Sequence, residues 1–149
     1  MYKHLLIASD GSELAGKALT HGLELAQSLG ARVTVLTASA PFPMPGYGTV
    51  PAATLIEAYE KATTENAERI LSAAGEAAKK LGVICETIHA RAREPAEVIV
   101  DTAQSKACDL IVMASHGYHA VKRLLLGSVA IEVLAHSKVP VLIFRNQTT

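Results

Sequence analysis

The stretch LIVMASHGYHAVKRLLLGSV, residues 110–129, decides the fold class of this chain. It begins with four large apolar residues and continues through a glycine turn and a partly apolar crossover to a second glycine that opens a helix. A strand that is apolar on both faces is typical of parallel sheets that helices cover on both sides. The stretch therefore predicts an inner strand of a parallel sheet followed by a helix.

Four more apolar runs and four helical stretches accompany this strand. The apolar runs lie at residues 5–8, 33–36, 83–88 and 141–144, and the helical stretches lie at 13–29, 53–81, 95–105 and 128–136. Gly30 and Gly82 are stop signals for the first two helices, and Pro95 occupies a permitted first-turn position. This alternation predicts an open, doubly wound, five-stranded parallel sheet with helices on both faces, a Rossmann-like α/β fold.

The composition is that of a globular chain, and we expect one domain, residues 1–149. Half of the residues are apolar, 19% are charged, and 14 basic residues balance 14 acidic ones. A chain without net charge and with 4% aromatic residues is a poor binder of nucleic acid or of anionic membranes. No apolar stretch is long enough to span a membrane. Cys85 and Cys108 form no disulfide or metal motif, which predicts a reducing, cytoplasmic setting.

Residues 40–51 predict an irregular loop. They hold four of the six prolines, which lack the amide hydrogen that helices and strands use. Long loops in compact domains often serve a function, so this loop is a candidate functional segment.

The segment after the first strand is the first candidate site. Ligands of open α/β sheets bind at the carboxyl ends of the strands, where the strand order reverses. Asp10 stands at such an end and is able to accept a hydrogen bond from a ligand hydroxyl or amine. A purely structural interpretation is also open, in which Asp10 and Ser12 only begin the helix and Glu13 adds a favourable charge to its first turn.

The segment after the fourth strand is the second candidate site. Gly117 permits a positive φ and close approach of the backbone, and Gly127-Ser128 exposes amides at a helix start, which suit phosphate oxygens. Neither a Walker loop nor a GxGxxG motif is present. The structural alternative is that Gly127 and Ser128 only cap the helix.

Other chemistry has weaker support in the sequence. His116 and His119 are three residues apart, but zinc needs three or four ligands and no cysteine or acidic residue flanks the pair. Lys122 and Arg123 either contact phosphate or form a solvated face. No G-x-S-x-G elbow or Ser/His/Asp arrangement predicts a nucleophile, and residues 89–91 lack the aspartate of a receiver domain.

Taken together, these segments resemble the universal stress protein family. Its nucleotide-binding branch has an aspartate at the end of the first strand and, later, a Gly-x2-Gly-x9-Gly-Ser/Thr signature. Here Asp10 ends the first strand, and nine residues separate Gly117 from Gly127-Ser128. Ala114 replaces the first signature glycine, so a methyl group is expected beside the ribose. The resemblance covers essentially the whole chain, including Pro95-Ala96-Glu97 and Val139-Pro140-Val141-Leu142.

The resemblance implies an adenine-nucleotide alpha hydrolase-like fold and a small ATP-binding stress or regulatory module. ATP, AMP or ADP would place the adenine by Asp10 and Ala38, with Mg²⁺ as a companion of ATP. The resemblance also implies a homodimer that pairs the last strands, residues 141–144. The alternative is slow ATP hydrolysis or nucleotidyl transfer at the same site, for which Asp10 is the one candidate metal carboxylate.

The resemblance also implies a set of nucleotide-binding residues, which lie in the two candidate segments and, for Ala38, after the second strand. No catalytic or metal-ligating residue is assigned. The phosphates are expected at Gly117, Gly127, Ser128 and Val129. The full expected set is Ala8, Ser9, Asp10, Ala38, Met113, Ala114, His116, Gly117, Gly127, Ser128 and Val129.

Overall fold

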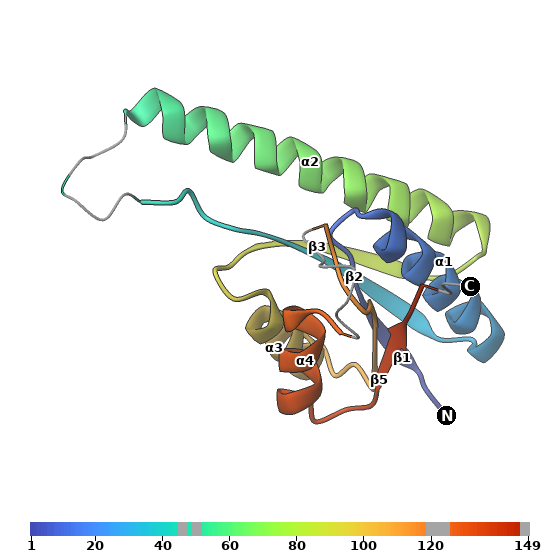
Figure 1. Cartoon of the computed structure of the whole chain (residues 1–149). Helices are drawn as coiled ribbons and strands as arrows, with labels where there is room; N and C mark the ends of the chain where they lie inside the picture. Colours follow the sequence, from blue (N-terminus) through green and yellow to red (C-terminus); the bar gives the residue numbers. More distant parts are fainter. Residues whose placement is uncertain (45–47, 49–51, 119–125, 147–149) are drawn as a thin grey trace.

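The structure, a computed structural model, describes residues 1–44, 48, 52–118 and 126–146 (Figure 1). Residues 45–47 and 49–51 of the proline-rich loop therefore lie outside the described residues, as do His119, Lys122 and Arg123. The elements in chain order are β1 (His4–Ala8), α1 (Glu13–Leu29), β2 (Arg32–Ser39), α2 (Ala53–Lys80), β3 (Cys85–Arg91), α3 (Pro95–Ser105), β4 (Leu110–Ala114), α4 (Ser128–His136) and β5 (Val141–Phe144).

The strands form a five-stranded parallel sheet in the order β3-β2-β1-β4-β5. Helices cover both faces of this sheet, and the predicted doubly wound α/β fold is confirmed (Figure 1). The chain adds strands in one direction from β1 to β3 and in the other direction from β4 to β5. The strand order therefore reverses between β1 and β4, which is where ligands of such sheets bind.

The sheet has a hydrophobic core on each face, because successive side chains of β1 point to opposite faces. Leu5 and Ile7 pack with α1 and α2 on one face, whereas Leu6 packs with α3 and α4 on the other. All three side chains are fully buried. Burial of each such side chain contributes about 1.5–3 kcal/mol, so β1, the central strand of the sheet, helps to hold both layers in place.

Local capping explains why the bounds of α1 agree with the predicted 13–29. Ser12 Oγ accepts a hydrogen bond from the Ala15 amide at 3.3 Å, which satisfies an amide that the helix leaves unpaired. At the other end Gly30 adopts a left-handed φ of 65°, and the Ala31 amide donates to the Ala26 carbonyl. The structural interpretation of Ser12 is therefore correct.

The prediction for the third strand is wrong in its bounds and its burial. The expected buried run was 83–88, but β3 spans Cys85–Arg91 and none of its residues is fully buried. Val83 is buried in the turn before the strand, while Ile84 is 77% exposed. The physical reason is position, because β3 lies at an edge of the sheet and pairs with β2 alone.

Helix α2 is anchored by its carboxyl-terminal half. Its four buried residues are Ala67, Leu71, Ala74 and Ala78, and Figure 1 shows the amino-terminal half extending beyond the sheet. Arg91 at the end of β3 supports that half, because its guanidinium donates to the Thr63 and Thr64 hydroxyls. Within the described ranges, no helix combines the length and apolarity needed to cross a membrane.

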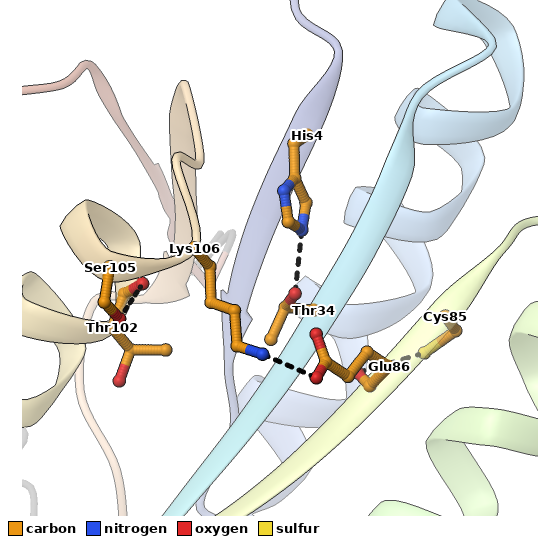
Figure 2. Close-up of polar contacts among 7 residues, drawn as sticks. All are labelled: His4, Thr34, Cys85, Glu86, Thr102, Ser105 and Lys106. Atoms are coloured by element: carbon orange, nitrogen blue, oxygen red, sulfur yellow. Dashed lines mark hydrogen bonds and ion pairs between the residues drawn. The ribbon is translucent and has the colours of Figure 1, made fainter.

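A polar network lies near the amino ends of β1, β2 and β3 (Figure 2). His4 is 6% exposed, and its Nε2 shares a 2.7 Å hydrogen bond with Thr34 Oγ1 of β2. Beside this pair, Lys106 at the end of α3 forms a 2.7 Å ion pair with Glu86 of β3. Asp109 accepts from the His4 amide at 3.1 Å. The network therefore joins three strands to the α3–β4 turn.

Acidification should destabilise the fold through His4. Burial, followed by the nearby Arg32 charge, lowers the pKa of His4 below its ordinary value of 6.5, and Asp109 and Glu86 only partly oppose this. The unfolded chain therefore binds the proton first, and the free energy of unfolding decreases as the pH falls below 6.5 until the folded state also titrates.

Urea denaturation between about pH 8 and about pH 5 measures this effect, since unperturbed histidines titrate within that window. We expect His4→Gln to lose less stability over this range than the wild type, although it is less stable at the upper pH. An equal loss in both proteins would show that other groups carry the pH dependence.

Candidate functional site

A pocket of about 370 Å³ lies at the carboxyl ends of the strands, where the order reverses. The segments after β1 and β4 form its central walls, and the end of β2 and the first turns of α3 and α4 complete it. Ser9 and Ser115 fix these segments, because their amides donate to the Leu36 and Phe144 carbonyls at 3.0 and 2.8 Å. The pocket is thus built on the ends of paired strands.

The pocket brings together all the residues in the expected nucleotide-binding set. These are Ala8, Ser9, Asp10, Ala38, Met113, Ala114, His116, Gly117, Gly127, Ser128 and Val129. Sequence reasoning missed further lining residues, which are Ala15, Leu36, Pro95, Ile99, Ser115, Tyr118 and Ala130. Leu36 precedes Ala38 by two residues and so shares its strand face, and Pro95 and Ile99 are one helical turn apart. The periodicity of the strand and of the helix could therefore have indicated these lining residues. No local pattern indicated Tyr118.

Asp10 is held by two amides that come from different segments. Its Oδ1 accepts from the Ser12 amide at 2.9 Å, and its Oδ2 accepts from the Tyr118 amide at 3.3 Å. A carboxylate has about four acceptor positions, so each oxygen of Asp10 keeps capacity for a further hydrogen bond. Asp10 therefore has a structural role in the turn and remains an acceptor at the pocket.

Position 117 needs glycine because a side chain would not fit there, and not because its backbone is left-handed. Its φ is not among the positive values, whereas Gly11, next to Asp10, has a φ of 82°. A β-carbon at Gly117 would overlap Asp10 Oδ2. The close approach that the sequence predicted at Gly117 is therefore made, within the protein, by the Asp10 carboxylate.

The amino terminus of α4 forms part of the pocket wall, and its first amides lack partners within the helix. Gly127 is its N-cap and no side chain caps the helix, in contrast to α1. The first intrahelical bond runs from the Ile131 amide to the Gly127 carbonyl at 3.1 Å. The amides of the three preceding residues have no partner within the helix, and these residues, Ser128, Val129 and Ala130, all line the pocket. The positive end of the helix dipole adds to their preference for an anion.

The pocket wall beside this helix terminus is tightly packed. The Gly127 amide donates to the Ser115 carbonyl at 2.6 Å. A β-carbon at Gly127 would lie 3.1 Å from that oxygen and 3.2 Å from His116 Cα. Because the two nearest neighbours are backbone atoms, a side chain at this position would push against the wall at Ser115 and His116.

The polar side chains of the pocket are few. Asp10 is the only carboxylate among the described residues that line it. His116 Nδ1 is buried and has no hydrogen-bond partner among those residues whose placement is described. No group of three His, Cys, Asp or Glu side chains that could hold a metal ion occurs in the described part of the chain. The remaining walls are largely apolar, formed by residues such as Leu36, Ile99 and Met113.

Ala114 has a packing role that the sequence did not indicate. It is 9% exposed and packs in a small cluster with Leu14, Ala15 and Ala18 of α1, against which Phe144 also lies. Ala114 lines the pocket as well. The methyl group expected beside a ribose is therefore also part of the contact between β4 and α1.

Comparison with known proteins places the chain in a sequence family. The sequence profile of the universal stress protein family matches residues 1–145. The universal stress protein YxiE of Bacillus subtilis is 35% identical over 153 residues, which cover 97% of this chain and 100% of YxiE.

Solved structures agree with this sequence match. Protein MJ0577 of Methanocaldococcus jannaschii superposes with a TM-score of 0.84 at 27% identity and covers 100% of this chain and 99% of its own. A universal stress protein solved in complex with cAMP has a TM-score of 0.70 at 27% identity, with 99% of each chain covered. A universal stress protein of Archaeoglobus fulgidus in complex with dAMP has a TM-score of 0.61 at 28% identity, with 95% and 97% covered.

Replacement of Ala114 by glycine should destabilise the fold. The change removes a buried methyl group and adds backbone freedom to the unfolded chain, so we expect Ala114→Gly to lower the free energy of unfolding by about 1–2 kcal/mol. Ala90→Gly, on the partly exposed edge strand β3, serves as the control and should lose less. Urea denaturation measures both variants. Equal losses would mean that the packing of Ala114 contributes nothing.

Proposed function

The chain belongs to the universal stress protein family, and from that premise we propose that it binds an adenine nucleotide, ATP, in the pocket between β1, β4 and α4. The free amino terminus of α4 is the observation that carries this proposal. Three residues whose amides have no partner within the helix line the pocket, and such amides suit the oxygens of a phosphate group. Gly127 allows the chain to reach this helix start without a side chain in the way.

The apolar part of the pocket suits a purine and its ribose. Leu36, Ala38, Pro95 and Ile99 are apolar lining residues of the kind that cover the face of a planar base. Asp10 lines the same pocket and has free acceptor capacity. It would accept from a ribose hydroxyl or from the adenine amino group, which leaves the phosphates to the start of α4.

Relatives support an adenine nucleotide as the ligand class. Two universal stress proteins with similar folds were solved with cAMP and with dAMP. ATP, ADP and AMP share with these ligands the adenine and the first phosphate group. We propose ATP because this chain keeps the spacing of Gly117, Gly127 and Ser128 found in the ATP-binding branch that it resembles.

Binding, rather than hydrolysis, is the activity that we propose. Hydrolysis needs a positioned base and carboxylates that hold a metal ion. Of the described lining residues, Asp10 alone offers a carboxylate, and its remaining acceptor positions are those that the proposed contact with the ribose or the adenine would use. We therefore assign no protein ligand to Mg²⁺, which would accompany ATP through its phosphates. Occupancy of the pocket would act as a regulatory signal in the cytoplasm, where the free thiols Cys85 and Cys108 would stay reduced.

We also propose a homodimer in which two copies pair their β5 strands. The sheet has two edges, β3 and β5. The sequence of β5 is Val-Leu-Ile-Phe, whereas β3 carries Glu86 and Arg91. Charged side chains protect an edge strand against pairing, and an apolar edge favours it. The residues of β5 are only partly buried in the single chain, so pairing would cover them further.

Substitution of Gly127 should separate nucleotide binding from folding. We expect Gly127→Val to weaken ATP binding by about tenfold or more, because the new side chain displaces the wall at Ser115 and His116. Gly16→Val is the matched control, since a β-carbon at this exposed position of α1 meets no atom within 4 Å. Isothermal titration calorimetry with ATP and AMP measures both variants, and circular dichroism checks that they fold.

The wild-type titration decides the ligand class. Heat of binding with ATP, together with adenine nucleotide detected by mass spectrometry in the purified protein, would support the proposal. Absence of binding by ATP, ADP and AMP would overturn it. Equal ATP affinities in wild type and Gly127→Val would mean that the nucleotide binds elsewhere.

Pairing through β5 is tested by a substitution in β5, with a matching substitution in β3, at the opposite edge of the sheet, as the control. Ile143→Lys of β5 and Ile88→Lys of β3 both place a charge at a partly buried position against the same apolar core. We expect light scattering to give twice the monomer mass for the wild type and for Ile88→Lys, but the monomer mass for Ile143→Lys. A monomeric wild type at high concentration, or dimeric Ile143→Lys, would reject pairing through β5.

A further inference from the structure

We propose that Tyr118 is the positioning residue of the nucleotide pocket, because it ties the end of β4 to the turn after β1 and thereby fixes Asp10. This inference rests on the proposed nucleotide binding. Tyr118 contacts the β1–α1 turn twice. Its amide donates to Asp10 Oδ2 at 3.3 Å, and its hydroxyl donates to the Gly11 carbonyl at 2.7 Å.

The two contacts connect the strands between which the pocket opens. Tyr118 follows β4, and Asp10 and Gly11 follow β1, so the bonds join residues that are 108 and 107 positions apart in the sequence. The paired positions of β1 and β4 end at Ile7 and Val112. Beyond these paired positions, the two hydrogen bonds of Tyr118 hold the segments after β1 and β4 together, and Tyr118 also lines the pocket.

The turn that carries Asp10 is confined from several sides. A β-carbon at Gly11 would lie 2.7 Å from Ile70 Cδ1 of α2 and 3.5 Å from the Tyr118 hydroxyl. Gly117 lies against the Asp10 carboxylate on the β4 side. The Ser12 amide holds the second carboxylate oxygen at 2.9 Å. Of these constraints, the Tyr118 hydroxyl is the one that a single conservative substitution removes without changing the backbone.

The exposure of Tyr118 indicates that it orients Asp10 rather than stabilises the fold. Tyr118 is 66% exposed, so its ring contributes little to the core. A hydrogen bond in this setting contributes a small amount to the stability of the whole fold. Its effect on ligand binding is direct, because a ligand that must itself orient a loose Asp10 loses affinity.

Tyr118→Phe and Tyr59→Phe form a matched pair. Tyr59 also donates its hydroxyl to a backbone carbonyl, that of Ala40 at 2.9 Å, but it lies on α2 and does not line the pocket. We expect Tyr118→Phe to weaken ATP binding by about fivefold, which corresponds to the loss of one ordinary hydrogen bond, and Tyr59→Phe to leave it unchanged. Both variants should have similar free energies of unfolding.

Hydrogen exchange of the free protein supplies a readout that does not need the ligand. The amides of Ser12 and of residue 118 both donate to Asp10. We expect both amides to exchange faster in Tyr118→Phe than in the wild type, with no change in Tyr59→Phe. Faster exchange together with weaker ATP binding would support the positioning role.

Each remaining outcome overturns a defined part of the argument. Unchanged exchange at Ser12 and residue 118 would show that the hydroxyl does not hold the turn, whatever the affinity. Equal ATP affinities in wild type and Tyr118→Phe would overturn the positioning role while the proposed function stands. A wild type that binds no adenine nucleotide would overturn the proposed function, and the inference with it.

Discussion

The burial of β1 on both faces is the constraint on which the structure depends. Leu5, Leu6 and Ile7 are successive residues that are fully buried, two against α1 and α2 and one against α3 and α4. Such a strand must lie inside the sheet with helices on both sides. The chain leaves β1 toward β2 on one side and leaves β4 toward β5 on the other, so the segments after these two strands depart in opposite directions. The pocket is the consequence of this route.

Much of what the described pocket wall offers a ligand belongs to the backbone. Amides at the start of α4 and glycines at positions 117 and 127 shape one side, and Asp10 is the single carboxylate among its described lining residues. Backbone groups held by secondary structure lose little freedom when a ligand binds, which favours affinity without long side chains. The same geometry leaves few described groups that could activate water. In the function proposed above, such a pocket would hold the nucleotide rather than consume it.

Local signals in the sequence were enough for most of the fold and for much of the site. Ser12, Gly30 and Pro95 are end signals that act within a few residues, and the bounds of α1 and α3 were predicted correctly. The run at 83–88 failed because apolar character alone does not distinguish an edge strand from an inner one, and Ile84 is exposed. Tyr118 was missed as a pocket residue because its contacts reach Asp10 and Gly11 across the fold. No periodicity within one element reports such a contact.

The extension of α2 beyond the sheet has a consequence for how this architecture tolerates changes in length. Before Ala67 no residue of α2 is fully buried, and the described support of that half includes hydrogen bonds from Arg91 to the helix. One turn inserted or deleted near Ala53 would shift only exposed side chains and would leave the strand register and the pocket in place. Surface segments accept such changes more readily than the core does. The outer half of α2 is therefore a part of the chain whose length can vary at low cost to the pocket.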